Sequence, residues 1–113
     1  MVGMSTATHF DYATPQPLRS ELDQLQGPVV VEFGTSWCGH CRAAQPFVAT
    51  AFAAHPKVRH IKVEDGSGRV LGRSFGVKLW PTLVFLRDGK EAARLVRPLA
   101  FAPVAEALAR IDP

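Results

Sequence analysis

The chain has 113 residues, of which 47% are hydrophobic and 20% are charged, and its formal net charge is +3. This length fits one domain with a single core, and the composition is ordinary for a globular protein. So small a charge, with no basic run in the sequence, argues against nucleic acid or an anionic membrane as a partner. The apolar segments are also shorter than a bilayer span, so we expect no membrane-spanning helix.

The N-terminal segment is polar and lacks both the basic region and the apolar stretch of a signal peptide. We therefore expect a cytoplasmic protein, whose two cysteines serve catalysis or metal binding rather than a disulfide framework. Residues 1–17 are expected to form an N-terminal extension, in which a short first strand over Thr8–Tyr12 is one interpretation. Residues 18–113 are expected to form the domain.

The first element of the domain is a predicted short amphipathic helix. Leu18, Leu22 and Leu25 recur at helical spacing, and the helix is expected to end near Gln26, before a Gly-Pro pair. The β-branched run Val29–Phe33 then predicts a strand that is covered on both faces and is therefore central in a sheet.

A short loop connects this strand to an Ala-rich helix that is expected to reach about Ala54 and to kink at Pro46. The later patterns predict, in order, a strand over Val58–Glu64, a short helix over Arg69–Phe75, a strand over Thr82–Leu86, a hairpin at Asp88-Gly89, a strand over Ala93–Val96 and a helix with Val104, Leu108 and Ile111 buried. This order predicts an α/β fold with a mixed sheet and helices on both faces.

The segment Trp37–Cys41 holds both cysteines in a Cys-x-x-Cys pattern. Such a pair closes and opens by thiol–disulfide exchange, which predicts electron transfer between sulfurs. At the first turn of a helix, unpaired N–H groups and the helix dipole favour an anion, so we expect Cys38 to be an exposed nucleophile with a lowered thiol pKa. Cys41, three residues later and more buried, is expected to resolve the mixed disulfide.

His40 lies between the two cysteines. An imidazole beside a thiolate would stabilise the reduced form and make the disulfide a stronger oxidant, whereas the alternative is a solvated turn residue. Metal binding is a further alternative for the cysteine pair, but a closed zinc site needs four ligands and the chain has no second pair. We expect no metal and no cofactor apart from the redox-active Cys38–Cys41 disulfide.

Glu32 is the one charged residue of the predicted central strand. Burial of a carboxylate is costly, so its pKa should rise unless a cation or water compensates. A buried carboxylate near Cys41 could relay the proton that Cys41 must lose. On composition alone, the alternative that Glu32 points into water from an edge strand stays open.

Taken together, these motifs resemble the thioredoxin superfamily over about Leu18 to Ile111. A Cys-Gly-His-Cys motif with a Glu six residues before its first cysteine is similar to protein disulfide isomerase domains. The residues that carry the resemblance are Val29–Phe33, Trp37–Cys41, Pro46, Trp80-Pro81-Thr82 and Asp88-Gly89-Lys90.

The resemblance implies a thioredoxin fold, a cis peptide bond before Pro81 facing the dithiol, and a functional Glu32 with Lys62 as its partner. Two positions depart from the family pattern. Trp80 replaces a small or β-branched residue and could cover the dithiol, narrow the groove or stack on a substrate. Arg97 replaces a glycine beside the docking surface and could exclude some partners or select acidic ones.

The substrate groove is expected to involve Trp37, Gly39, Trp80 and Arg97, with Trp37 also shielding the thiols and packing on the helix start. The predicted function is a thiol–disulfide oxidoreductase acting on protein or small-molecule disulfides. Its partners are then protein disulfide substrates and a reductase or thiol donor, and the protein is expected to be a monomer. The alternative is a thioredoxin-like binding or redox-sensing module with little turnover.

Overall fold

The structure is a computed structural model and describes residues 12–113. The first strand considered for Thr8–Tyr12 lies outside the described residues, except for Tyr12 itself. In the described part, the elements follow the order α1 (Arg19–Asp23), β1 (Pro28–Gly34), α2 (Gly39–Ala53), β2 (Arg59–Glu64), α3 (Val70–Ser74), β3 (Thr82–Arg87), β4 (Lys90–Val96) and α4 (Phe101–Ile111).

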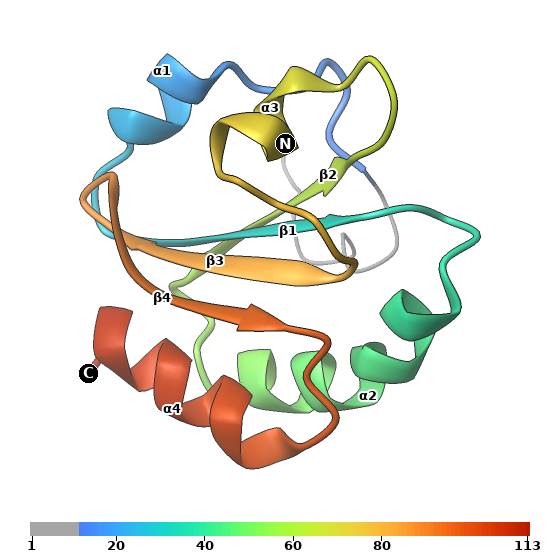
Figure 1. The fold of residues 1–113 in the computed structure, drawn as a ribbon. Coiled ribbons are helices and arrows are strands. Elements are labelled where there is room, and N and C mark those ends of the chain that lie inside the picture. Colours follow the sequence, from blue (N-terminus) through green and yellow to red (C-terminus); the bar gives the residue numbers. More distant parts are fainter. Residues whose placement is uncertain (1–11) are drawn as a thin grey trace.

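The strands form one mixed sheet in the order β2-β1-β3-β4. β1 is parallel to β2 and antiparallel to β3, and β3 is antiparallel to β4. Figure 1 shows α1 and α3 on one side of this sheet and α2 and α4 on the other. The predicted mixed sheet with helices on both faces is therefore confirmed, and β1 is a central strand as its β-branched sequence indicated.

Alternate side chains of β1 enter two separate cores because successive residues of a strand point to opposite faces. Val31 and Phe33 pack with the α3 residue Leu71 on one face. On the other face, Val30 packs with Val48 of α2 and with residues of α4. Glu32 and Gly34 share the Val30 face by this alternation, which places the carboxylate of Glu32 on the side of the sheet that α2 covers.

The first helix is shorter than predicted. It ends at Asp23 rather than near Gln26, and Leu18 is an exposed N-cap residue, so Leu22 alone is buried among the residues of α1. Gly27 has a positive φ of 80°, and its N–H donates to Oδ1 of Asp88 at 2.7 Å. The chain therefore leaves the helix after Asp23, and Leu25, beyond the helix, packs partly buried against the core.

The predicted hairpin between β3 and β4 is confirmed at Asp88 and Gly89. Their φ angles are 52° and 80°, and two consecutive positive values are typical of the tight turns that match the twist of hairpin strands. The closing helix α4 buries Val104, Leu108 and Ile111, as predicted.

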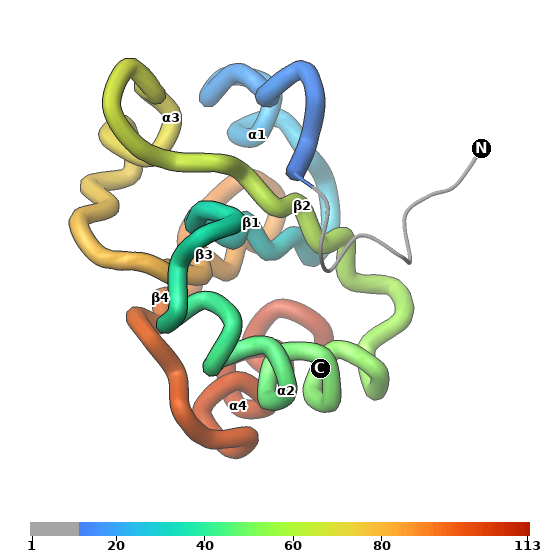
Figure 2. Tube along the Cα trace, turned by 90° about the vertical axis from the view of Figure 1, so that its right-hand side faces the viewer, coloured from blue at the N-terminus to red at the C-terminus, as the bar shows by residue number. Residues whose placement is uncertain are grey.

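The end of β1 and the start of β3 lie next to each other because the two strands are antiparallel and Phe33 is paired with Thr82. The β1–α2 loop and the segment that enters β3 therefore reach the same end of the sheet. Figures 1 and 2 show this arrangement from two directions. The Cys-x-x-Cys motif and Pro81 are brought together in this way although they are far apart in sequence.

Candidate active site

The two cysteines lie at the N-terminus of α2. Cys38 is the N-cap residue, and its Sγ accepts a hydrogen bond from the backbone N–H of Cys41 at 3.1 Å. Both side chains are free thiols in this structure. The spacing therefore places both sulfurs at one turn of the helix, within reach of exchange with each other.

Cys38 is less exposed than we expected. The exposed fraction is 6% for Cys38 and 5% for Cys41, so the predicted contrast between an exposed and a buried cysteine is wrong. The physical reason is the capping geometry: the sulfur of Cys38 is turned back over the first turn of α2 to accept the N–H of Cys41. A substrate must therefore approach Cys38 closely or displace its neighbours to reach the sulfur.

Cys41 is chemically distinct because it is held as a thiol. Burial raises its pKa to about 12, and the hydrogen bond and charge of Cys38 and the charge of Glu32 act in the same direction. A backbone hydrogen bond of Thr35 opposes the rise only in part. Cys41 must therefore lose a proton to a nearby base before it can act as a nucleophile.

Gly34, at the end of β1, makes room for the sulfur of Cys41. A Cβ atom at this position would lie 2.7 Å from Sγ of Cys41 and 3.7 Å from the hydroxyl oxygen of Tyr12. Only glycine allows the strand to approach the thiol this closely. Gly34 and Glu32 are two residues apart on the same face of β1. The thiol of Cys41, which lies against Gly34, is therefore next to the position of the Glu32 side chain along the strand.

The carboxylate of Glu32 is buried, with an exposed fraction of 1%, so the edge-strand alternative is excluded. Nε2 of His60 lies 2.7 Å from Oε1, and Nε2 of Gln45 donates to Oε2 at 2.9 Å. Each carboxylate oxygen therefore has a hydrogen-bond partner from a different element, His60 from β2 and Gln45 from α2.

Burial by itself raises the pKa of Glu32, but the surrounding groups reverse the shift. The hydrogen bond and charge of His60, the charge of Lys62 and the hydrogen bond from Gln45 hold the pKa below its usual value. A raised pKa was expected unless a cation compensated for burial, and the charges of His60 and Lys62 provide that compensation. Glu32 is therefore arranged to remain ionised at neutral pH despite its burial.

Lys62 lies directly opposite Glu32 in the parallel β1–β2 pair. Its ammonium group is 5.2 Å from the ring centre of Tyr12. Tyr12 is half-buried near the same thiol, and burial together with the negative charges of Cys41 and Glu32 raises its pKa. The phenol is consequently a neutral hydrogen-bonding group at physiological pH.

The Trp80–Pro81 peptide bond is cis. The indole N–H of Trp80 donates to Oδ2 of Asp65 at 2.8 Å, and its ring meets Trp37 edge to face with 5.6 Å between centroids. Trp37 is itself 69% exposed, so it does not pack into the helix start as expected. The two indoles instead form an aromatic surface beside the dithiol loop.

Arg97 follows β4 and has a positive φ of 52°. Its backbone N–H donates to the carbonyl of Pro81 at 2.9 Å, and its Nε donates to the carbonyl of Trp80 at 2.8 Å. The side chain thus lies against the cis-proline segment, which is the docking surface beside which the sequence resemblance placed it.

His40 and Gly39 occupy the first turn of α2, and both are exposed. Within residues 12–113 we find no hydrogen bond or ion pair of the His40 side chain. A Cβ on Gly39 would meet no atom within 4 Å, so the helix start is open on this side.

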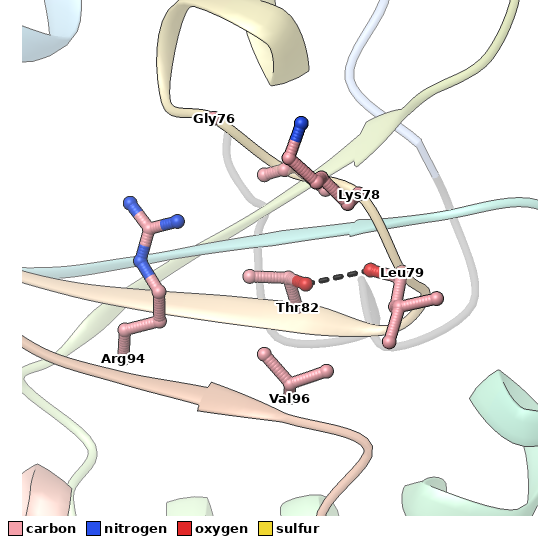
Figure 3. Close-up of a pocket in the computed structure, with 7 residues that line it drawn as sticks. Gly76, Lys78, Leu79, Thr82, Arg94 and Val96 are labelled. Carbon is pink, nitrogen blue, oxygen red and sulfur yellow. Dashed lines mark hydrogen bonds between the residues drawn. The ribbon is translucent and has the colours of Figure 1, made fainter.

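A groove of about 220 Å³ adjoins the cis-proline segment (Figure 3). Leu79, Thr82 and Val96 line it, with the charged side chains of Lys78 and Arg94. Thr82 shares its strand face with Val84, which packs in the core of the α1/α3 side. The groove therefore opens on the side of the sheet opposite α2.

His60 and Gln45 are not among the site residues that the sequence indicated, yet both contact the carboxylate of Glu32. Two signals could have found them. His60 precedes Lys62 by two residues, which puts both on one face of β2. Gln45 follows Cys41 by four residues, which puts both on one face of α2.

No helix of the described residues is long and apolar enough to cross a membrane. Over the same residues, no three His, Cys, Asp or Glu side chains gather as ligands for a metal ion would.

The sequence matches the family model "Thioredoxin" over residues 10–109. It is 40% identical to thioredoxin H-type 1 of Nicotiana tabacum over 68 residues, which are 60% of this chain and 54% of the tobacco protein. It is 46% identical to protein disulfide-isomerase erp38 of Neurospora crassa over 67 residues, or 56% of this chain and 18% of that protein. The matched region thus spans about half of the plant relative and a smaller part of the fungal one.

Among solved structures, the chain is similar to reduced thioredoxin 2 of Pseudomonas aeruginosa. The TM-score is 0.76 and the identity is 62%, and the match covers 85% of this chain and 89% of the other.

Proposed function

This chain belongs to the thioredoxin family, and we propose that it is a thiol–disulfide oxidoreductase acting on protein or small-molecule disulfides. One observation carries the proposal. The two thiols of Cys38 and Cys41 share the first turn of α2, at the end of the sheet where the cis-proline segment begins. A dithiol at a helix N-terminus is suited to disulfide exchange.

The reaction proceeds in two displacements. The thiolate of Cys38 attacks one sulfur of the substrate disulfide, a mixed disulfide forms, and the first substrate thiolate leaves with the electron pair of the broken bond. Cys41 then attacks Sγ of Cys38, which forms the Cys38–Cys41 disulfide and releases the second substrate thiolate. Both leaving thiolates take up protons, so the substrate gains two electrons and two protons.

The second displacement needs a base because Cys41 is held as a thiol, with its pKa raised to about 12 by burial. Glu32 is the proposed base: it accepts the proton of Cys41 and later returns it to solvent or to a leaving thiolate. Lys62 supports the ionised carboxylate from the paired position on β2. The close approach of Cys41 to Gly34, on the same strand face as Glu32, supports this assignment.

The substrate strand is proposed to bind across Pro81, with the indoles of Trp37 and Trp80 on one side. Gly39 leaves the helix start open to the substrate, and Arg97 adds a positive charge beside the docking edge. His40 is proposed to stabilise the reduced thiolate from its exposed place in the first turn of α2.

The electron donor is proposed to be a reductase or a small thiol, and the protein is proposed to work as a monomer in a reducing compartment such as the cytoplasm. Both cysteines of the chain belong to the exchange pair, which suits that setting. The redox-active dithiol itself carries the electrons, so no further cofactor is required.

The test is catalysed reduction of a protein disulfide with an excess of a small dithiol. Cys38→Ser should abolish turnover. Reduced Cys41→Ser, mixed with the protein disulfide after the small dithiol has been removed, should stop as a mixed disulfide that mass spectrometry detects. The contact of the exposed Trp37 with the half-buried Trp80 favours a second candidate, a binding or redox-sensing module with little turnover. Partner binding by a Cys38→Ser/Cys41→Ser variant, without turnover by the unmodified protein, would establish that candidate instead.

A further inference from the structure

The buried carboxylate of Glu32 is held by a histidine. Nε2 of His60 and Oε1 of Glu32 are 2.7 Å apart, and the exposed fractions of their side chains are 6% and 2%. At this distance and burial, the contact is a strong hydrogen bond in a region of low dielectric. His60 and Glu32 therefore act as one polar unit beneath α2.

The position of His60 is fixed by packing as well as by this hydrogen bond. Its ring stacks on Phe52 of α2, with 4.4 Å between centroids and 28° between planes. In the β1–β2 register, Val30 is paired with His60 and Glu32 with Lys62. The imidazole thus reaches the carboxylate diagonally, while Lys62 lies directly opposite it.

The ionisable groups around this unit divide into two kinds. His60 and Lys62 favour the ionised carboxylate, and the hydrogen bond and charge of His60 each contribute more than the charge of Lys62. On the other side of Glu32 lie the thiols of Cys38 and Cys41 and the phenol of Tyr12. The negative charge of Glu32 raises the pKa of both Cys41 and Tyr12. A substitution of His60 that alters Glu32 should therefore also alter the ionisation of Cys41.

We propose that His60 is a positioning residue for the resolving step, because its 2.7 Å contact with Oε1 holds the carboxylate of Glu32 in place to receive the proton of Cys41. The inference rests on the proposed function and deepens it. In the step, the proton moves from Sγ of Cys41 to Glu32, and the freed electron pair forms the bond to Sγ of Cys38. The substrate thiolate leaves with the electrons of the broken mixed disulfide, while His60 keeps its hydrogen bond to Oε1.

The experiment follows the reaction of the reduced protein with an aromatic disulfide whose released thiolate is coloured. The first thiolate appears when Cys38 attacks, and the second appears when Cys41 resolves the mixed disulfide. His60→Phe keeps a ring to stack on Phe52 but removes the donor. We expect it to slow the second phase about 10-fold or more and to leave the first unchanged, since positioned proton transfer contributes roughly 10²–10⁴-fold.

Three further variants identify the cause. His60→Gln keeps an N–H donor and should restore the second phase most of the way. Glu32→Gln should slow that phase as His60→Phe does, and adding His60→Phe to Glu32→Gln should cause no further loss. His55→Gln is the matched control, because His55 makes the same kind of contact with Asp112, at 2.8 Å, away from the dithiol.

A direct readout is the carboxyl carbon signal of Glu32, followed by NMR against pH. In His60→Phe the carboxyl group should ionise at a higher pH than in the unmodified protein, and in His60→Gln the change should be smaller. If His60→Phe does not fold, His60→Asn replaces it, since its shorter amide does not span to Oε1.

The inference is overturned if the second phase is unchanged in His60→Phe, or if the loss is just as large in the Glu32→Gln background. Equal slowing of both phases would also overturn it, because His60 would then support the whole site rather than one step. The first phase in the unmodified protein tests the proposed function separately. Its absence would remove that function, whatever the variants of His60 do.

Discussion

The backbone N–H of Cys41 donates a hydrogen bond to Sγ of Cys38 at 3.1 Å, so the first thiol of the motif caps the helix that carries the second. Because the sulfur of Cys38 accepts this N–H, it occupies the place where a helix N-terminus favours negative charge. Cys41 lies one turn further into the helix and is held as a thiol by burial. The same three-residue spacing thus gives the two thiols different chemistry.

Cys41 should react slowly with alkylating reagents at neutral pH. Burial raises its pKa to about 12, so its reactive thiolate is scarce until the solution becomes strongly alkaline. The measurement is the rate of iodoacetamide labelling of Cys38→Ala, followed by mass spectrometry over a pH series. The same variant unfolded in denaturant is the control and should label rapidly. Equal rates in the folded and unfolded protein would contradict the prediction.

Glu32 should stabilise the fold at neutral pH, and this contribution to the free energy of unfolding should be lost in acid. Its folded pKa lies below its unfolded value, so its contribution is complete above the unfolded pKa, about 4.3, and is lost as the pH falls through the folded pKa. Glu32→Gln should therefore unfold more easily than the unmodified protein at neutral pH, by about 1–3 kcal/mol, and this difference should shrink on acidification.

Urea unfolding at several pH values measures this difference. Glu106→Gln is the control, because Glu106 is an exposed carboxylate on α4 and should change the stability little at any pH. A stability difference for Glu32→Gln that grows as the pH falls would show that the carboxylate is not held ionised.

Gly34→Ala should destabilise the protein by about 1–3 kcal/mol, because the added Cβ would lie 2.7 Å from Sγ of Cys41. Thermal or urea unfolding of the reduced protein measures the loss. Gly39→Ala is the matched control for stability, since a Cβ there meets nothing within 4 Å. If both substitutions had the same effect, the close approach of β1 to the thiol would be refuted.

Arg97 should favour acidic substrates. Arg97→Gln should lower the rate toward disulfide peptides with acidic flanks by up to about fivefold, the equivalent of about 1 kcal/mol for one half-buried surface charge. The preference should weaken at high salt because exposed charges are screened. Arg59→Gln removes the same charge from β2, at the other edge of the sheet, and is the control. Identical losses for both variants would point to net charge rather than to Arg97.

The disulfide should be less reducing than that of thioredoxin, roughly −270 mV, because His40 stabilises the reduced form. His40→Ala should make the reduction potential more negative by about 20 mV, the equivalent of about 1 kcal/mol. Equilibration in glutathione buffers, read by tryptophan fluorescence, gives the value. His55→Ala serves as the control. A potential that does not move in His40→Ala would leave His40 as a solvated turn residue.

Local patterns in the sequence predicted the elements that position the site. The β-branched run around Glu32 indicated a central strand, and the Asp88-Gly89 pair indicated a hairpin, because both signals depend only on neighbouring residues. The spacing of Cys38 and Cys41 indicated a dithiol at a helix start for the same reason. The exposure of Cys38 was predicted wrongly, since spacing does not show which way a capping side chain turns.

The order and spacing of residues were enough to predict the chemistry of the protein: a dithiol, a helix N-terminus to carry it and one acidic residue in the strand before it. The surroundings of that acid depend on how distant segments pack together. His60 and Gln45 reach Glu32 from two other elements, and Gly34 gives Cys41 its space. The sequence could not specify these contacts, because a buried carboxylate is stabilised by whichever groups the packing of separate segments brings within hydrogen-bond distance.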